Sequence, residues 1–334
     1  LSALCGEADP LVRAHFGEYS EPRSRDFVQP FRMLSQLPAN VRECCERNVR
    51  YYPEIENTRY TVWSKSGAAT VYQLFLAAFM GMPGITLAIH DLDGGAFADE
   101  PRYWNVIRDN KELLSKLKSR DFASMKELGV AIPTSWQSGK KIRLTDGGYE
   151  EMGGCRRYFD SYLLKMGIPC SYRNTKELTA AGVTALDPFT AAYLDDDELK
   201  TVLSGGVLME AGAAKVLVER GFSAYIGIDS MEKRHWDVNV EILNTFTRED
   251  GTYIRIPSRV PLNCWYKAAC REGVEVLSEF ADLRGNRSEA MTWYENSLGG
   301  RVAVYLAEND FGSGFFTHYR VRFFKDVIAR LAPQ

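Results

Sequence analysis

Short apolar runs alternate with helix-length amphipathic stretches along the first third of the chain. Apolar runs bounded by turn residues are typical of buried strands, and apolar residues at helical spacing are typical of helices. The pattern predicts strands at Ser2–Cys5, Val49–Pro53 and Ile85–His90, and helices at Phe31–Glu46, Ala68–Met80 and Tyr103–Lys118. Because strands and helices alternate, we expect a parallel βα layer here.

A second series of strands and helices follows from about Lys126. The expected strands are Gly129–Pro133, Cys170–Tyr172, Gly182–Leu186, Val207–Met209, Ala224–Ile228 and Gly300–Tyr305, and the expected helices are Tyr158–Met166, Asp195–Ser204, Ala213–Glu219 and Tyr319–Leu331. This rhythm predicts a mostly parallel sheet that is covered on both faces. We therefore expect two domains, residues 1–125 and 126–334, with a boundary between Leu117 and Gly129.

Composition narrows the classes of partner. The 334 residues include 41 Lys and Arg against 44 Asp and Glu, a net charge of −3, so nothing indicates binding to nucleic acid or to an anionic membrane. The longest apolar runs fall far short of the roughly 20 residues that span a bilayer. No G-x-G-x-x-G or Walker loop is present, which argues against a phosphate or nucleotide ligand. We expect no cofactor and no metal.

The cysteines and the first residues bear on the compartment. The seven cysteines follow neither a disulfide framework nor a zinc spacing, so we expect reduced thiols. Reduced thiols favour a cytoplasmic location, with a periplasmic one left open. The sequence starts at Leu1 without Met or a signal peptide, and we expect it to be the tail of a longer protein.

The candidate chemistry lies at the end of the second expected strand, in the run Tyr51-Tyr52-Pro53-Glu54-Ile55-Glu56-Asn57. Because side chains alternate along a strand, Glu54 and Glu56 are expected on the same face of the sheet. Acids at the carboxyl ends of strands are how a (β/α)₈ barrel builds an active site. The alternative is that both are solvated loop acids, since exposure is the default for Glu.

Other polar and aromatic residues follow the neighbouring expected strands. Candidates for substrate binding are His15, Glu18, Tyr52, Asn57, Trp63, Lys65, His90, Asp91 and Asp93. His15 and Glu18 stand in an expected loop after the first strand, and the rings of Tyr52 and Trp63 offer flat surfaces for sugars. Lys65 is expected to pair with Glu54 or Glu56 or else to be an exposed surface lysine. An Asp-x-Asp such as Asp91 and Asp93 is also common in solvated turns.

The order of these motifs resembles bacterial β-galactosidase-type glycoside hydrolases of family forty-two. The matching stretches are Pro53–Asn57, Trp63–Ser66, Gly84–Asp91, Leu203–Met209 and Asn296–Val304. The resemblance implies the C-terminal part of a (β/α)₈ barrel followed by a flavodoxin-like domain, related to class I glutamine amidotransferases, that serves in homo-oligomerisation. It also implies that Pro53–Asn57 ends barrel strand seven, which carries the nucleophile.

The sequence departs from that family in two ways. Barrel strands one to five, with the Asn-Glu pair that supplies the general acid/base, would precede Leu1. No cysteine stands in the G-x-C-x-G elbow that amidotransferase chemistry needs, so we expect a non-catalytic second domain. The sequence thus predicts a retaining glycoside hydrolase acting through Glu54 and Glu56, with Glu54 ranked first as nucleophile. The alternative is a non-catalytic carbohydrate-binding or oligomerisation module.

Overall fold

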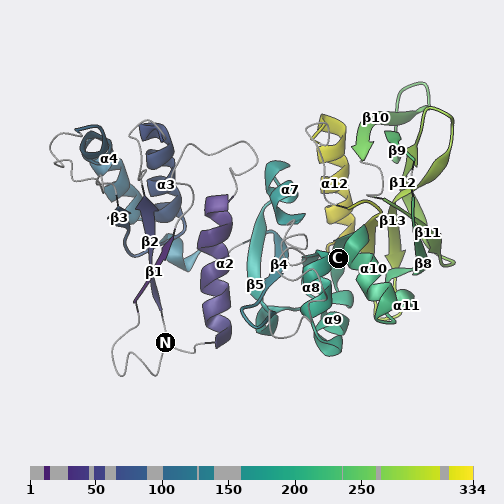
Figure 1. Cartoon of the computed structure of the whole chain (residues 1–334), viewed down its shortest axis with the longest axis horizontal. Helices are drawn as coiled ribbons and strands as arrows, with labels where there is room; N and C mark the ends of the chain where they lie inside the picture. Colours follow the sequence, from purple (N-terminus) through teal and green to yellow (C-terminus); the bar gives the residue numbers. More distant parts are fainter. Residues whose placement is uncertain are drawn as a thin grey trace. The chain divides into compact units, whose positions relative to one another are not determined.

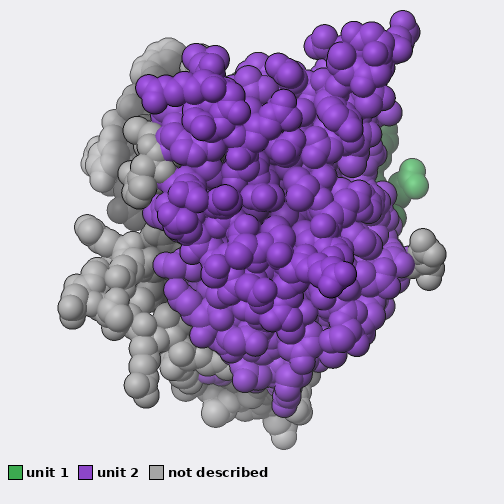
Figure 2. All heavy atoms as spheres, turned by 90° about the vertical axis from the view of Figure 1, so that its right-hand side faces the viewer, with its two compact units in different colours: residues 1–127 green, residues 128–334 purple. Residues whose placement is uncertain are grey.

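The computed structural model describes residues 11–15, 29–44, 49–56, 65–88, 101–125, 128–138, 159–234, 236–260, 265–308 and 316–333. The chain divides into two compact units, Leu1–Glu127 and Leu128–Gln334, which Figure 2 colours separately. Each unit has its own sheet and its own core. Within the described part of the chain, no helix has both the length and the apolar character that crossing a bilayer requires.

Unit 1 is a three-stranded parallel sheet with helices between its strands (Figure 1). Its elements are β1 (Leu11–His15), α2 (Gln29–Cys44), β2 (Arg50–Glu56), α3 (Gly67–Phe79), β3 (Thr86–Ala88), α4 (Pro101–Lys118) and the 3₁₀ turn η2 (Phe122–Ser124). β2 lies in the centre and pairs in parallel with β1 and with β3. This is the repeating βα arrangement of part of a (β/α)₈ barrel.

The start of unit 1 differs from the sequence prediction. The expected strand Ser2–Cys5 lies outside the described residues. The strand before β2 in the chain, and paired with it, is Leu11–His15, so His15 belongs to a strand and not to the loop in which the sequence analysis placed it. The short run Leu11–His15 was missed because Arg13 and His15 interrupt its apolar character.

Unit 2 is built on a nine-stranded mixed sheet. Its strands are β4 (Val130–Thr134), β5 (Cys170–Asn174), β6 (Val183–Leu186), β7 (Gly206–Glu210), β9 (Val238–Thr247), β10 (Tyr253–Val260), β12 (Glu275–Ala281), β13 (Arg287–Glu295) and β14 (Arg301–Tyr305). The strand order is β10-β9-β12-β13-β14-β7-β6-β4-β5. β5, β4, β6, β7 and β14 are mutually parallel, and numbered along the chain they run 2-1-3-4-5, the flavodoxin-like order. The predicted α/β class, part of a barrel and then a flavodoxin-like unit, is confirmed.

Helices cover both faces of the parallel half of this sheet (Figure 1). They are α7 (Phe159–Lys165), η3 (Thr175–Glu177), α8 (Pro188–Tyr193), α9 (Asp196–Leu203), α10 (Ala211–Glu219), α11 (Ser223–Ile226) and α12 (His318–Leu331). The core under α8 to α11 includes Val207 and Met209, the alternate residues of β7. α12 packs on β7 and β14 through its buried residues, among them Phe323 and Phe324.

In unit 2 the sequence analysis was wrong at one expected strand and left six strands unassigned, namely β8 to β13. Residues 224–228 do not form a strand: Ser223–Ile226 is the helix α11, Gly227 turns with φ +74°, and β8 (Ile228–Lys233) starts after it. β8 pairs with β11 (Tyr266–Cys270) in a separate two-stranded sheet. β9, β10, β12 and β13 extend the parallel sheet with antiparallel strands that the sequence analysis left unassigned.

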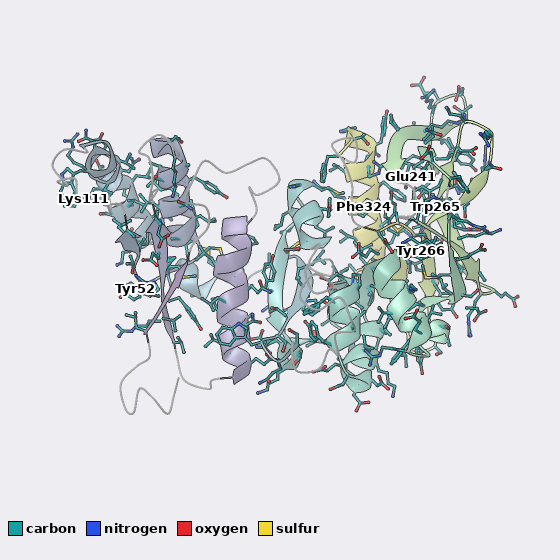
Figure 3. The ribbon with its side chains drawn as sticks, viewed as in Figure 1. Tyr52, Lys111, Glu241, Trp265, Tyr266 and Phe324 are labelled. Carbon is teal, nitrogen blue, oxygen red and sulfur yellow. The ribbon has the colours of Figure 1, made fainter. Side chains whose placement is uncertain are left out.

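A buried ion pair connects α12 to β9, one of these antiparallel strands. Arg320 and Glu241 are both fully buried, and Arg320 Nη2 donates to Glu241 Oε2 at 2.8 Å. Tyr305 Oη donates to the same oxygen at 3.1 Å, and Ser278 Oγ donates to Oε1 at 2.7 Å. Figure 3 labels Glu241 near Phe324 of α12. Each carboxylate oxygen therefore has partners, as a buried charge requires.

The turn before β14 explains one motif from the sequence. Asn296 Nδ2 donates to the backbone oxygens of Leu203 and Tyr225, at 2.9 and 3.0 Å, and its Oδ1 accepts from the backbone amides of Leu298 and Gly300. A Cβ on Gly300 would lie 1.9 Å from the Leu203 oxygen, so only glycine fits there. The Asn-Ser-Leu-Gly-Gly run is thus a structural joint between α9 and β14.

Candidate active site

The two faces of β2 have different surroundings. Ile55 is fully buried in a cluster with Leu34 of α2 and Leu74 and Ala77 of α3, and Val106 of α4 packs against this cluster. Because side chains alternate along a strand, Glu54 and Glu56 project from the opposite face. In a (β/α) barrel the face away from the helices is the interior, and chemistry takes place at the carboxyl ends of the strands. Glu56 is the last residue of β2 and Glu54 lies two before it.

Glu54 is buried and bound to a cation from the neighbouring strand. Its relative exposure is 7%. Arg13 Nη1 of β1 donates to Glu54 Oε1 at 2.6 Å. The Arg13 side chain is itself 62% exposed, so the guanidinium bridges a buried carboxylate and solvent. Within the described residues, no hydrogen bond or ion pair joins Glu54 to any other side chain.

The pairing register brings more of the predicted residues beside Glu54. His15 of β1 is the direct partner of Glu54, and Arg13 is the partner of Tyr52. On the other side, Thr86 of β3 is paired with Glu54 and Ala88 with Glu56. The sheet thus places His15, Tyr52, Glu54 and Glu56 on neighbouring positions of two strands.

Lys65 contacts the carboxyl end of β2. It is only 4% exposed, and its Nζ donates to the backbone oxygen of Glu56 at 2.8 Å. The sequence alternative of an exposed surface lysine is therefore wrong. Ser66, the next residue, caps α3 by accepting from the amide of Ala69 at 3.1 Å. Lys65 thus ties the carboxyl end of β2 to the start of α3.

Tyr52 is partly buried, and its ring packs over a glycine in the turn before β3. A Cβ on Gly84 would lie 2.1 Å from Cε1 of Tyr52, so the ring occupies the space that any larger residue at 84 would need. This contact places the ring at the amino-terminal side of Glu54 on β2. Figure 3 shows Tyr52 at the sheet of unit 1.

The remaining predicted site residues are not described by the structure. Glu18, Asn57, Trp63, His90, Asp91 and Asp93 lie outside the described residues, and their roles stay predictions. The sequence analysis did not identify Arg13, which the structure shows to be the ion-pair partner of Glu54. Among the described residues, no group of three or more His, Cys, Asp or Glu is placed to hold a metal ion.

Unit 2 has a direct strand-to-helix junction of the kind that carries a nucleophile in other α/β enzymes. β7 ends at Glu210 and α10 begins at Ala211. Glu210 is 2% exposed and has ordinary extended backbone angles, φ −95° and ψ 168°. A nucleophile elbow is a strained turn with an exposed nucleophile at its tip, and this junction has neither property.

The cysteines that the structure describes are poorly suited to nucleophilic chemistry. Cys170 is buried in β5. Burial, with the nearby charge of Glu289, raises the pKa of the Cys270 thiol to about 11, so the reactive thiolate is scarce at neutral pH. Neither Cys170 nor Cys270 forms a disulfide.

The fold has known counterparts among solved structures. α-L-Fucosidase isoenzyme 2 from Paenibacillus thiaminolyticus is similar over 98% of this chain, with a TM-score of 0.55 and 13% sequence identity. A polyextremophilic β-galactosidase from the Antarctic haloarchaeon Halorubrum lacusprofundi is similar over 96% of this chain, with a TM-score of 0.50 and 14% identity. The chain shares its fold with glycoside hydrolases. No protein-family model matches the sequence, and no curated protein matches it in sequence.

The similarity covers 50% of the fucosidase chain and 51% of the β-galactosidase chain. The chain therefore spans about half the length of these two proteins. Identities of 13% and 14% establish a common fold, and what either enzyme acts on is a property of that enzyme.

Proposed function

We propose that this chain forms part of a retaining, β-galactosidase-like glycoside hydrolase that acts on oligosaccharides or glycosides, with Glu54 as its nucleophile. The observation that carries the proposal is the position of Glu54. It is a buried carboxylate near the carboxyl end of the central strand of a parallel βα sheet, on the face opposite Ile55 and the helices that Ile55 packs against. Carboxylates in this position perform glycoside hydrolysis in barrel enzymes.

Arg13 prepares Glu54 for attack in this proposal. The guanidinium holds Oε1 at 2.6 Å and fixes the orientation of the carboxylate. The other oxygen, Oε2, is then the one that attacks the anomeric carbon as the leaving group departs. A fixed carboxylate loses little orientational freedom at the transition state, which is the general benefit of such positioning.

Glu56 has a supporting role. Two carboxylates that flank a scissile bond in a retaining enzyme are about 5–5.5 Å apart and approach the sugar from different sides. The Cα atoms of Glu54 and Glu56 are about 6.6–6.8 Å apart along one extended strand, and their side chains project in parallel. We therefore assign Glu56 to sugar hydroxyls and place the proton donor on a strand other than β1, β2 and β3.

Substrate contacts in the proposal come from neighbouring strand ends. His15, Tyr52, Lys65 and the undescribed Glu18, Asn57, Trp63, His90, Asp91 and Asp93 are the candidates. Unit 2 is proposed to be non-catalytic, which the ordinary backbone at Glu210 and the raised pKa of Cys270 support. Its proposed role is homo-oligomerisation. The proposed partner of unit 1 is a carbohydrate.

Turnover of two aryl β-galactosides by the full chain tests this proposal. 2,4-Dinitrophenol leaves without a proton, whereas p-nitrophenol benefits from general acid help worth about 10²–10⁴-fold in rate. We expect a stoichiometric burst of dinitrophenol, and p-nitrophenol release too slow for a normal glycosidase. Glu54→Gln should lose the burst, because an amide does not attack the anomeric carbon.

Two other outcomes would decide against parts of the proposal. Ordinary steady turnover of the p-nitrophenyl glycoside would mean that the chain carries its own acid/base. Binding of galactosides without any burst, equal in wild type and Glu54→Gln, would favour the alternative of a non-catalytic carbohydrate-binding module.

A further inference from the structure

Unit 1 contains a second hollow, at the opposite end of β3 from the candidate active site. It has a volume of about 450 Å³ and is lined by the end of α3, the α3–β3 turn and the end of α4. The turn residue Ile85 lies just before β3, whereas Glu56 pairs with Ala88 at the far end of that strand. The pocket therefore lies at the opposite end of the sheet from Glu56, and Tyr52, which packs on Gly84 of its lining, is the candidate substrate residue that lies next to it.

The pocket walls are apolar and their shape follows from the backbone. Ala78, Met82, Pro83, Ile85 and Leu114 supply the apolar side chains of the wall. Gly81 adopts φ +69° where α3 ends, and the Met82 amide donates to the Ala77 oxygen at 3.1 Å, which closes the turn. A glycine at this C-terminal turn leaves no side chain to fill the space above it.

Gly84 also lines the pocket, and the Tyr52 ring fills the space of its missing Cβ. The hollow is left by the small residues Ala78 and Gly81, and its volume is within the range of about 300–1,000 Å³ that is typical of small-molecule sites.

Two cations stand at the rim of this apolar hollow. Lys118, the last residue of α4, donates from Nζ to the Pro83 oxygen at 3.1 Å and so reaches across the pocket edge. Arg120 also lines the pocket, two residues after Lys118. Within the described part of the chain, Arg120 has no ion-pair partner. Asp121, the one carboxylate of the lining, accepts from the Ser124 amide at 3.2 Å as the cap of η2.

The side chains at the rim favour an anion. Lys118 and Arg120 outnumber Asp121, and carbonyls at the carboxyl ends of α3 and α4 already accept from the backbone amides of Met82 and Arg120. We propose that this pocket binds a small amphipathic monoanion, an alkyl or aryl carboxylate, with its apolar body against Ile85 and Leu114 and its carboxylate beside Lys118 and Arg120. Contact with the apolar walls is expected to supply most of the binding free energy, and the two cations the preference for an anion over a neutral ligand.

Octanoate and its uncharged amide, octanamide, are a matched pair of probes. Their binding to the full chain is measured by titration calorimetry. We expect saturable one-site binding of octanoate and weaker binding of octanamide. Lys118→Gln and Arg120→Gln should each weaken octanoate about two- to five-fold, as expected for exposed charges, and leave octanamide unchanged. Lys111→Gln, on the exposed side of α4 and labelled in Figure 3, is the control and should change neither.

A blocking variant tests the location independently of charge. Ala78→Phe should fill the hollow and remove binding of both probes, provided that its circular dichroism and unfolding curve match the wild type. The proposal is overturned if octanoate shows no saturable binding or binds no better than octanamide. It is also overturned if Lys111→Gln weakens octanoate as much as Lys118→Gln does, or if a folded Ala78→Phe binds normally.

Discussion

Arg13 Nη1 lies 2.6 Å from Glu54 Oε1, although the two residues are 41 positions apart in the chain. The contact results from the parallel pairing of β1 with β2. In this register His15 is the direct partner of Glu54, and Arg13 lies two residues before His15. The Arg13 side chain is exposed to solvent, but the carboxylate that it binds is buried. The same contact can matter greatly for the orientation of the carboxylate.

Replacing Arg13 should affect both activity and stability. Arg13→Gln leaves the buried Glu54 carboxylate without its cation, so we expect the free energy of unfolding to fall by about 1–3 kcal/mol, more than for a pair that is exposed on both sides. The dinitrophenol burst should slow by about ten-fold, equivalent to about 1.4 kcal/mol of lost transition-state stabilisation. Arg13→Lys should recover part of the rate. Stability loss of several kcal/mol with an unchanged burst would show that Arg13 is structural.

The Arg320–Glu241 pair should cost more to break. Both side chains are fully buried, so Glu241→Gln removes the negative charge that pairs with a buried guanidinium and is expected to cost about 3–5 kcal/mol in urea unfolding. The double variant Glu241→Leu with Arg320→Met should recover much of this loss. Glu275→Gln removes an exposed pair with Arg330 and should cost under about 1 kcal/mol. Equal costs for the two single variants would contradict the buried assignment.

Asp187 should make the stability of unit 2 depend on pH. Burial, with a further contribution from Asp160, raises the pKa of Asp187 from 3.8 to about 6 in the folded protein, although the amide of Thr190 donates to it at 2.7 Å. Because the folded pKa is the higher one, the stabilisation is present below about pH 4 and is lost as the pH rises through 6.

The variant Asp187→Asn isolates this effect. Asparagine keeps the cap on α8 and carries no charge, so it should match the wild type near pH 4 and exceed its stability above pH 7 by up to about 3 kcal/mol. The measurement is the difference in unfolding free energy between the two proteins from pH 4 to 8. Asp195→Asn, at the exposed cap of α9, is the control and should gain no stability above pH 6. A constant difference across this range would contradict the prediction.

The sequence predicted the parts of the fold that depend on local periodicity. The buried strand β2 and the apolar helix α3 have strong patterns, and the period of two placed Glu54 and Glu56 on one face of the sheet. The acidic turn at Asp195 predicted the start of α9, which the structure caps through that same side chain. Local signals of this kind need no knowledge of the partner segment.

What the sequence did not predict depends on distant segments. The Arg13–Glu54 contact requires the register of two strands, and Glu241 finds Arg320 79 positions later. The residues of β9 and β12 alternate only imperfectly because both contain buried polar groups, Glu241 and Ser278, that are satisfied by other elements. Residues 224–228 resembled a strand because their apolar residues pack in the core, which a short helix achieves equally well.

The most direct test of the proposed function is to identify the carboxylate that becomes glycosylated. The full chain is treated with 2,4-dinitrophenyl 2-deoxy-2-fluoro-β-galactoside, which needs no proton donor and forms a glycosyl-enzyme that hydrolyses slowly. Peptide mass mapping then locates the sugar. We expect the label on Glu54, its absence from Glu54→Gln and its retention by Glu56→Gln. A label on Glu56 would reverse the two roles, and no label on either residue would contradict the assignment of this site to glycoside hydrolysis.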